Sequence, residues 1–357
     1  MTMSSVSAEH NDVRVQGAPT PPVPARPSGA VQLWAIIGAV GVAVVSSSWL
    51  RWITSGDFEK PAPGPDAYDH LWWLRTVEVL SLSLVVGFFY VFVVRPWRRE
   101  RRLTFDGKLL IACTLAYYVD PILNYFNHSF AMNAHATSWG SWAQFIPGYA
   151  SPGQGRFAEG VLWAGAMYTY FGLGAALVGC GLLNRLRRRY TRVSTVWLYA
   201  AVYLAFCVGD FLVEVPLFVL PKVYVFSGVP RFGTLWAGEI YQFPIYEMLL
   251  ASVFALGFTW LRDSRDDRGR SAVERGVDEL RVGPRAKGLV SFLAICGAAL
   301  VIALSYFLPY SWLSMKADSY PALPSYLRTA AYCGQPDRPL CPSQYIRQLG
   351  TGTERHP

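Results

Sequence analysis

Acidic, amide and imidazole side chains occur at helical spacing inside stretches that are otherwise apolar. Asp120, Asn124 and His128 follow one another every four residues, so a continuous helix would carry them on one face. Asp210 and Glu214 repeat this spacing further along the chain. Ionisable groups in hydrocarbon are costly and usually mark sites or internal pairs. We therefore interpret both groups as parts of a functional site.

Proline residues and an unusually aromatic loop accompany these groups. Pro121 and Pro216 would bend the two helices and free backbone carbonyls that could help line a cavity. The segment 128–156 is too apolar for a solvated linker, and we interpret it as a lid over the helix ends. Other candidate residues, in this loop and in the stretch 239–261, are His135, Trp139, Trp142, Glu239, Tyr246 and Glu247.

Such side chains favour acid chemistry on a hydrophobic substrate. A carboxyl group buried among aromatic rings stays protonated and can act as a general acid. A second carboxylate, assisted by aromatic faces, can stabilise developing positive charge. This combination predicts cyclisation or dehydration through an oxocarbenium ion or a carbocation. The sequence has no HExxH, CxxC or DDxxD motif and no phosphate-binding glycine loop, so we predict neither a metal nor a cofactor.

Structural roles are the alternative for each of these residues. The Asp-x3-Glu pair could bind Arg75 or Arg231 and only hold a bundle together. Glu78, Glu159 and Glu239 lie near predicted membrane interfaces, where structural or solvated roles are favoured. A single histidine near an interface is more often a packing residue than a ligand.

The apolar stretches that carry these residues are long enough to cross a bilayer. Of the 357 residues, 52% are hydrophobic and only 16% are charged, whereas soluble domains carry about 25% charged residues. Each stretch approaches the roughly 20 helical residues that span the hydrocarbon core. We predict an all-α membrane bundle with helices at about 31–50, 74–95, 106–127, 157–183, 195–217, 239–261 and 287–309.

The distribution of basic residues predicts the orientation of the bundle. The N-terminus and the segments 95–108, 185–192 and 262–287 together hold 21 of the 32 Lys and Arg residues. These segments alternate with less basic ones, as seven crossings require, so we expect the N-terminus in the cytoplasm and the C-terminus outside. The basic residues that give the net charge of +8 cluster beside apolar stretches, so this charge does not indicate nucleic-acid binding. The segment 263–287 is expected to be either a solvated loop or an amphipathic helix.

We divide the chain into a disordered Pro-rich head (1–29), a transmembrane domain (30–310) and an extracytoplasmic tail (311–357). Cys333 and Cys341 in the tail could form a disulfide in an oxidising compartment. The other cysteines fall within predicted helices, where they are expected to be packing residues: Cys113, Cys180, Cys207 and Cys296.

Several short blocks carry a family resemblance: Trp97–Gly107, Asp120-Pro-x-x-Asn124-Tyr, Asn133-Ala-His135, Gly140-Ser-Trp142 and Ile146-Pro-Gly148. Together they resemble the AveC-like spirocyclase family of actinobacterial membrane proteins, over roughly residues 30–310. The resemblance implies a role in secondary metabolism and spiroketal formation, in which a dihydroxy-ketone closes twice onto its carbonyl carbon and loses water. It supplies no catalytic residues, so the assignments that follow rest on the residues themselves.

Our hypothesis is a membrane-embedded cyclase of the plasma membrane, with its site in the outer half of the bundle. Asp120 is expected to be the general acid, while Asp210 and Glu214 stabilise the cation and accept a proton. The expected substrate-binding residues are Asn124, His128, His135, Trp139, Trp142, Glu239, Tyr246 and Glu247. The expected partners are a hydrophobic small molecule and membrane lipid, with no nucleic acid, and the sequence does not identify a protein partner. The alternatives are a membrane terpene cyclase, a small-molecule transporter or a sensor.

Overall fold

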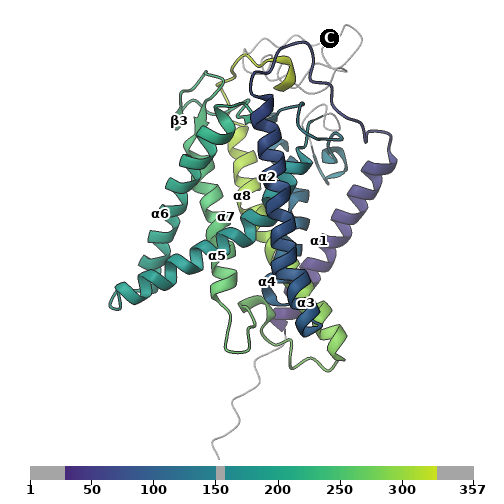
Figure 1. Cartoon of the computed structure of the whole chain (residues 1–357), viewed down its shortest axis with the longest axis vertical. Helices are drawn as coiled ribbons and strands as arrows, with labels where there is room; N and C mark the ends of the chain where they lie inside the picture. Colours follow the sequence, from purple (N-terminus) through teal and green to yellow (C-terminus); the bar gives the residue numbers. More distant parts are fainter. Residues whose placement is uncertain (1–28, 150–156, 328–357) are drawn as a thin grey trace, which may run out of the picture.

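The computed structural model describes residues 29–149 and 157–327, and it is mostly helical (Figure 1). Cys333 and Cys341, and most of the predicted head and tail, lie outside the described residues. The α-helices are α1 Gly29–Thr54, α2 Leu71–Phe89, α3 Arg95–Glu100, α4 Phe105–Ala116, α5 Ala166–Arg189, α6 Thr195–Glu214, α7 Ile245–Asp263 and α8 Pro284–Ser314.

Shorter elements extend or connect these helices. The π-helical turns are η1 Tyr90–Val94, η5 Val161–Gly165 and η6 Val215–Val219, and the 3-10 helices are η2 Tyr117–Asn124, η3 Ala143–Phe145, η7 Ala272–Glu274 and η8 Ser325–Leu327. The strands are β1 Ala131–Met132, β2 Tyr224–Val225, β3 Thr234–Leu235 and β4 Phe243–Pro244.

In the described part of the chain, 6 helices are long and apolar enough to cross a membrane, which indicates a membrane protein. The prediction of about seven differs by one because the third crossing is divided between α4 and η2. Pro121 lies inside η2 and cannot donate a helical hydrogen bond, so the tighter 3-10 helix replaces the expected α-helix. At ideal rises, α4 and η2 together extend about 34 Å, close to the thickness of a bilayer core.

The chain runs up and down between two ends of the bundle (Figure 1). The segments 101–104 and 264–283 lie at the lower end and the turn 190–194 lies at the lower left, whereas the connections 55–70, 125–149 and 220–244 lie toward the upper end. We call these the basic end and the outer end. The predicted alternation of the connections is therefore confirmed in the fold.

Close helix packing holds α1 against α8. A Cβ atom added to Gly38 would lie 1.8 Å from the carbonyl oxygen of Leu293, and one added to Gly297 would lie 2.4 Å from that of Trp34. Only glycine permits backbones to approach this closely, as in other membrane helix pairs. α8 also packs against α4 and α7, and α7 packs against α5 and α6.

The outer end is covered by the connections between helices. β1 pairs with β2 in antiparallel register, so the loop after η2 is joined to the loop after α6. The Asn124 side chain fixes the turn that leads into this pair: its Oδ1 accepts from the backbone N–H groups of Ser129 and Phe130, each at 2.9 Å. The expected lid therefore has a fixed, largely buried structure over residues 129–143.

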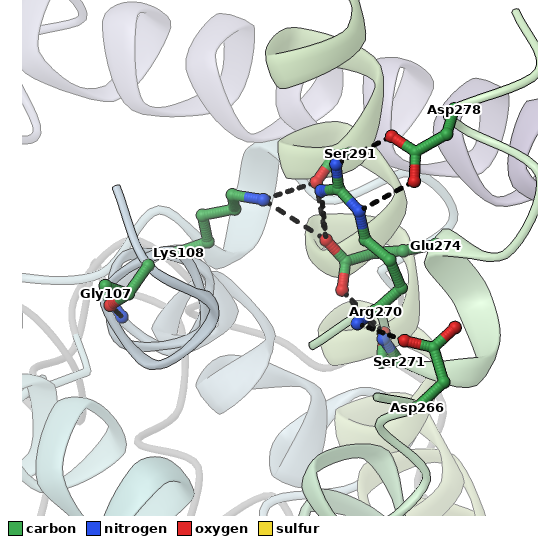
Figure 2. A network of polar contacts seen from close by, with 9 residues as sticks. Gly107, Lys108, Asp266, Arg270, Ser271, Glu274, Asp278 and Ser291 are labelled. Atoms are coloured by element: carbon green, nitrogen blue, oxygen red, sulfur yellow. Dashed lines mark hydrogen bonds and ion pairs between the residues drawn. The ribbon is translucent and has the colours of Figure 1, made fainter. Parts of the chain in front are cut away.

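A buried ionic network closes the basic end (Figure 2). Lys108 on α4 donates to Glu274 at 3.2 Å and also to Ser291 on α8. The second carboxylate oxygen of Glu274 accepts from the backbone N–H and the hydroxyl of Ser271, both at 3.0 Å. Most of the segment 263–287 is thus a loop with many exposed residues, as one of the two expectations had it, and not an amphipathic helix; buried Glu274 and Val277 anchor it against the bundle.

We expect the Lys108→Met substitution to destabilise the protein by about 3 kcal/mol, because it removes the nearer of the two cations at the buried Glu274 carboxylate and leaves only Arg270, 4.0 Å away. The melting temperature in detergent should fall by roughly 4 °C. Adding Glu274→Leu to this variant should recover part of the loss. Arg102→Met, which removes an exposed ion pair with Glu100, is the control and should melt near the wild type. A Lys108→Met protein with the same melting temperature as the Arg102→Met control would contradict a stabilising role for this ion pair.

Candidate functional site

A cavity of about 340 Å³ lies in the outer half of the bundle, between η2, α5, α6, α7 and α8. Its walls are mainly aromatic and apolar, and they include Phe130, Trp163, Phe171, Phe206, Phe218, Phe254 and Phe307. Carboxyl groups interrupt these walls at four positions, which are Asp120, Asp210, Glu214 and Glu247. An apolar cavity with a few convergent polar groups is the usual form of a small-molecule site.

Irregular helical turns shape the cavity on three sides. Asp120 comes from the 3-10 helix η2, Trp163 from the π-turn η5 and Phe218 from the π-turn η6. Pro216 lies in the first turn of η6, where it interrupts the hydrogen-bonding pattern of α6. π-turns inside longer helices frequently occur at functional sites because they re-aim side chains.

Asp120 forms one acidic pair with Glu159, which lies just before η5. The Asp120 carboxylate accepts a hydrogen bond from Tyr168 on α5 at 2.7 Å, and it shares a further hydrogen bond with Glu159. Ser141 donates to Glu159 at 2.9 Å. Burial, and then the neighbouring Asp120, raise the pKa of Glu159 well above its usual range. This pair can therefore hold and deliver a proton.

Three more carboxyl groups in the cavity lining come from α6 and α7. Asp210 and Glu214 lie one turn apart on α6, and Glu247 lies in the first turn of α7. One carboxylate oxygen from each of them lies within 4.8 Å of one from each of the others. Tyr306 donates to Glu247 at 2.9 Å, and Tyr224 donates to Glu214. We call Asp210, Glu214 and Glu247 the acidic trio.

The acidic trio lacks the basic partners that buried carboxylates usually have. Among the described residues, no ion pair joins any of the three to Lys or Arg. One oxygen of each carboxyl group also has no hydrogen-bond partner there, although all three atoms are buried. Unpaired buried charge is costly, so the trio must share protons or receive a cation. The same donor set has the oxygen chemistry and the spacing to hold a divalent metal ion.

A small polar pocket adjoins the cavity at Asp120. Its volume is about 10 Å³, and Asn124, His128 and Glu159 line it together with Asp120. This space is close to the smallest that holds one water molecule. Burial lowers the pKa of His128 to about 3, so its ring is neutral, and Nδ1 lies 3.1 Å from the Ser227 hydroxyl.

The model of the family described as spirocyclase AveC-like matches residues 100–332. The chain belongs to the AveC-like spirocyclase family. The matched region contains all five carboxyl groups described above but not α1 or α2, so it begins later than the expected resemblance and ends further into the tail. No curated protein and no solved structure matches the chain. The family suggests a cyclase with a role in secondary metabolism.

In this AveC-like protein, the structure brings together part of the predicted site. Asp120, Asp210, Glu214 and Glu247 all line the cavity. Asn124 and His128 line the adjoining small pocket instead, because η2 ends at Asn124 and His128 lies in the loop beyond it. The expectation of one continuous helical face through Asp120, Asn124 and His128 is therefore wrong.

Other predicted substrate-binding residues lie away from the cavity of this AveC-like protein. His135 stacks on Tyr68 with ring centroids 5.5 Å apart, and Trp139, 39% exposed, stacks on Phe58. Trp142 is buried and donates to the Tyr118 carbonyl, and Tyr246 packs against Tyr310. Glu239 is exposed in a turn before α7, so the expectation that it begins a helix is wrong. Their roles stay predictions, and our proposal does not use them.

The sequence interpretation missed the hydroxyl partners of the acids. Tyr168, Tyr224 and Tyr306 come from α5, β2 and α8, and no spacing in the sequence links them to the carboxyl groups. Glu159 was expected to have a structural role near the interface, but it is 2% exposed and paired with Asp120. Arg75, the suggested partner of the trio, instead binds Glu78 and the carbonyl oxygen of His135.

His128 should make this AveC-like protein less stable in acid. Its pKa is 6.5 in the unfolded chain and about 3 when folded, so between these values only the unfolded state binds the proton. Stability should therefore fall as the pH drops below about 6.5, by up to about 1.4 kcal/mol per unit. Melting temperatures between pH 7 and pH 4.5 should fall more steeply in the wild type than in His128→Gln.

Glu159 lines the same pocket, and its raised pKa has the opposite effect, because it favours the folded state at low pH. Glu159 is present in both proteins, so the difference between the pH dependences of their melting temperatures measures the contribution of His128. Parallel curves would show that His128 is not buried as a neutral ring.

Proposed function

We propose that this protein is a spirocyclase of the plasma membrane, with its basic end in the cytoplasm, that closes a hydrophobic hydroxy-ketone into a spiroketal with loss of water. One observation carries the proposal: a single apolar cavity holds Asp120 on one wall and the acidic trio on another. The positive-inside rule supports the orientation, because Lys and Arg are concentrated at the basic end.

The reaction needs an acid where water leaves and a negative environment where positive charge develops. One hydroxyl of the substrate adds to the ketone carbon to give a hemiketal. Asp120 then protonates the hemiketal hydroxyl, the C–O bond breaks, and water leaves an oxocarbenium ion. The second hydroxyl attacks this carbon and loses its proton to a carboxylate, so that one water is released for each spiroketal formed.

Asp120 is suited to the acid step by its neighbours. Glu159 and Tyr168 both hydrogen-bond to it, so a proton given to the substrate can be replaced along the same contacts. The small pocket on the other side of Asp120 has room for about one water molecule, and we assign it the water that leaves. Both features support a departing oxygen beside Asp120.

The acidic trio is suited to stabilising the cation. The trio has no basic partner among the described residues, so a cationic transition state supplies the positive charge that the ground state lacks. An interaction that strengthens only in the transition state accelerates the reaction. The aromatic walls add cation–π attraction.

Replacing Asp120 with Asn should lower turnover by at least about 100-fold, because the amide cannot supply the proton. The fold should survive, since Asn has the same shape and can accept from Tyr168. Asp267→Asn is the matched control, because it makes the same change on an exposed residue of the connection 264–283 and should retain full activity. Wild-type turnover by Asp120→Asn at equal membrane expression would remove Asp120 from the mechanism.

Comparing lipid extracts of the native host with and without the gene tests the reaction class. The deletion should replace one product with a precursor that is heavier by one water. A precursor of the same mass but different retention would indicate cyclisation without dehydration, of the terpene kind. A compound that only moves between cells and medium would indicate transport.

Chelation separates proton chemistry from a metal-assisted reaction at the acidic trio. We expect the purified protein to keep its activity after treatment with EDTA, because Asp120 and the trio supply the acid and the counter-charge. Activity that is lost and then restored by Mg²⁺ or Mn²⁺, with restoration absent in Glu214→Gln, would instead assign the trio to a metal ion.

A further inference from the structure

The cavity is closed on most sides by buried side chains. The lining residues from η2, the β1–β2 pair and α7 are all buried. The accessible part of the lining lies mainly on α5 and α6, and its residues are Met167, Tyr170, Phe171, Phe206, Gly209, Asp210 and Val213. Val213 is 50% exposed and also lines the cavity. The cavity therefore reaches the surface between these two helices.

The separation of α5 and α6 has a structural cause. The helices meet at the basic end, where Leu183, Leu198 and Val202 form a small buried cluster. From there α5 slants across the bundle while α6 stands beside it, so the two diverge toward the outer end (Figure 1). At that end Trp73 on α2 donates to the carbonyl oxygen of Leu217 at 2.7 Å and joins α6 to the bundle again. The opening is thus bounded at both ends.

The surface around this opening is apolar. On α6, Leu204, Val208 and Leu212 are each at least 60% exposed, as expected for side chains that face lipid. On the other side, Tyr170 is hydrogen-bonded to Ser81 of α2, which keeps its polar end away from the lipid. The opening therefore faces the hydrocarbon rather than the water on either side.

We propose that the opening between α5 and α6 is a lateral portal through which a long-chain hydroxy-ketone, dissolved in the bilayer, reaches the acidic groups. The substrate class rests on the proposed function, whereas the portal can be tested without it. The polar head of the substrate enters past Asp210, which lies at the accessible edge of the trio. Its apolar tail stays between α5 and α6 or in the surrounding lipid.

Gly209 sets the width of the portal. It lines the cavity, and a Cβ atom added there meets no other heavy atom within 4 Å. A side chain can therefore begin at this position without a clash at its Cβ atom. Gly181 on α5 also has open space around it, is exposed and does not line the cavity, so it provides a matched control.

Photolabelling in liposomes with a long-chain alkyl diazirine alcohol tests this proposal. Labels are located by peptide mass spectrometry on Glu214 and Glu247, which are 8% and 4% exposed and so are reached only through the cavity. The wild type, Gly209→Ala and Gly181→Trp should be labelled equally. Gly209→Trp should reduce the labelling of both residues at least fivefold, and Gly209→Leu should give an intermediate value.

Two outcomes would contradict the proposed portal. One is undiminished labelling of Glu214 and Glu247 in a folded Gly209→Trp protein. The other is equal labelling by a short, water-soluble diazirine alcohol, which would show that the cavity opens to water. If Gly209→Trp does not fold, the Gly209→Leu and Gly209→Ala variants decide in the same way. If Glu214 and Glu247 are labelled as expected but the protein has no cyclase activity, the portal proposal stands and the proposed function is rejected.

Discussion

Burying carboxyl groups without basic partners is the constraint on which the outer half of this protein depends. Asp210, Glu214 and Glu247 meet in an apolar cavity, and none of them forms an ion pair with the described residues. Such a cluster is tolerated only if protons are shared and hydroxyl groups donate to it. Tyr224 and Tyr306 make these contacts. They neutralise no charge, so the cluster remains ready for a cation.

At the basic end, buried carboxyl groups are stabilised by ion pairs instead. Its buried or half-buried acids are paired with cations: Glu274 with Lys108, Asp263 with Arg187, and Asp106 with Arg262. Each of these pairs joins two segments that are distant in the sequence, so the pairs fix the arrangement of the helices. The basic end thus holds paired charges that join its helices, whereas the acidic trio in the cavity has no basic partner among the described residues. This separation favours a functional role for the acids of the cavity over a purely structural one.

The sequence predicted the helices and the acids better than their surroundings. Length and hydropathy locate α1, α2, α5, α6, α7 and α8 because each must satisfy its own backbone hydrogen bonds in lipid. The four-residue spacing placed Asp210 and Glu214 together correctly, since α6 is regular until Glu214. The same argument failed for His128, because Pro121 lies in a 3-10 helix with a different periodicity.

Some acidic residues come together only through tertiary contacts, which sequence periodicity cannot show. Glu247 joins Glu214 only because α6 and α7 pack side by side, and Glu159 reaches Asp120 only after the long loop has folded back. His135 and Trp139 do not line the cavity, whereas the β1–β2 pairing positions Met132, which the sequence analysis did not single out, in the cavity wall. Polar residues in such loops cannot be assigned to a site before their strand partners are known.

The division of the cavity into two acidic walls has a chemical consequence. If Asp120 lay within the trio, the acid and the counter-charge would titrate together as one coupled group of carboxyls. Tyr168 and Glu159 hold Asp120 on its own wall, beside the small pocket, and Tyr224 and Tyr306 hold the trio on the other. Two carboxyl environments that differ in this way allow proton donation and cation stabilisation to occur in one cavity at the same pH.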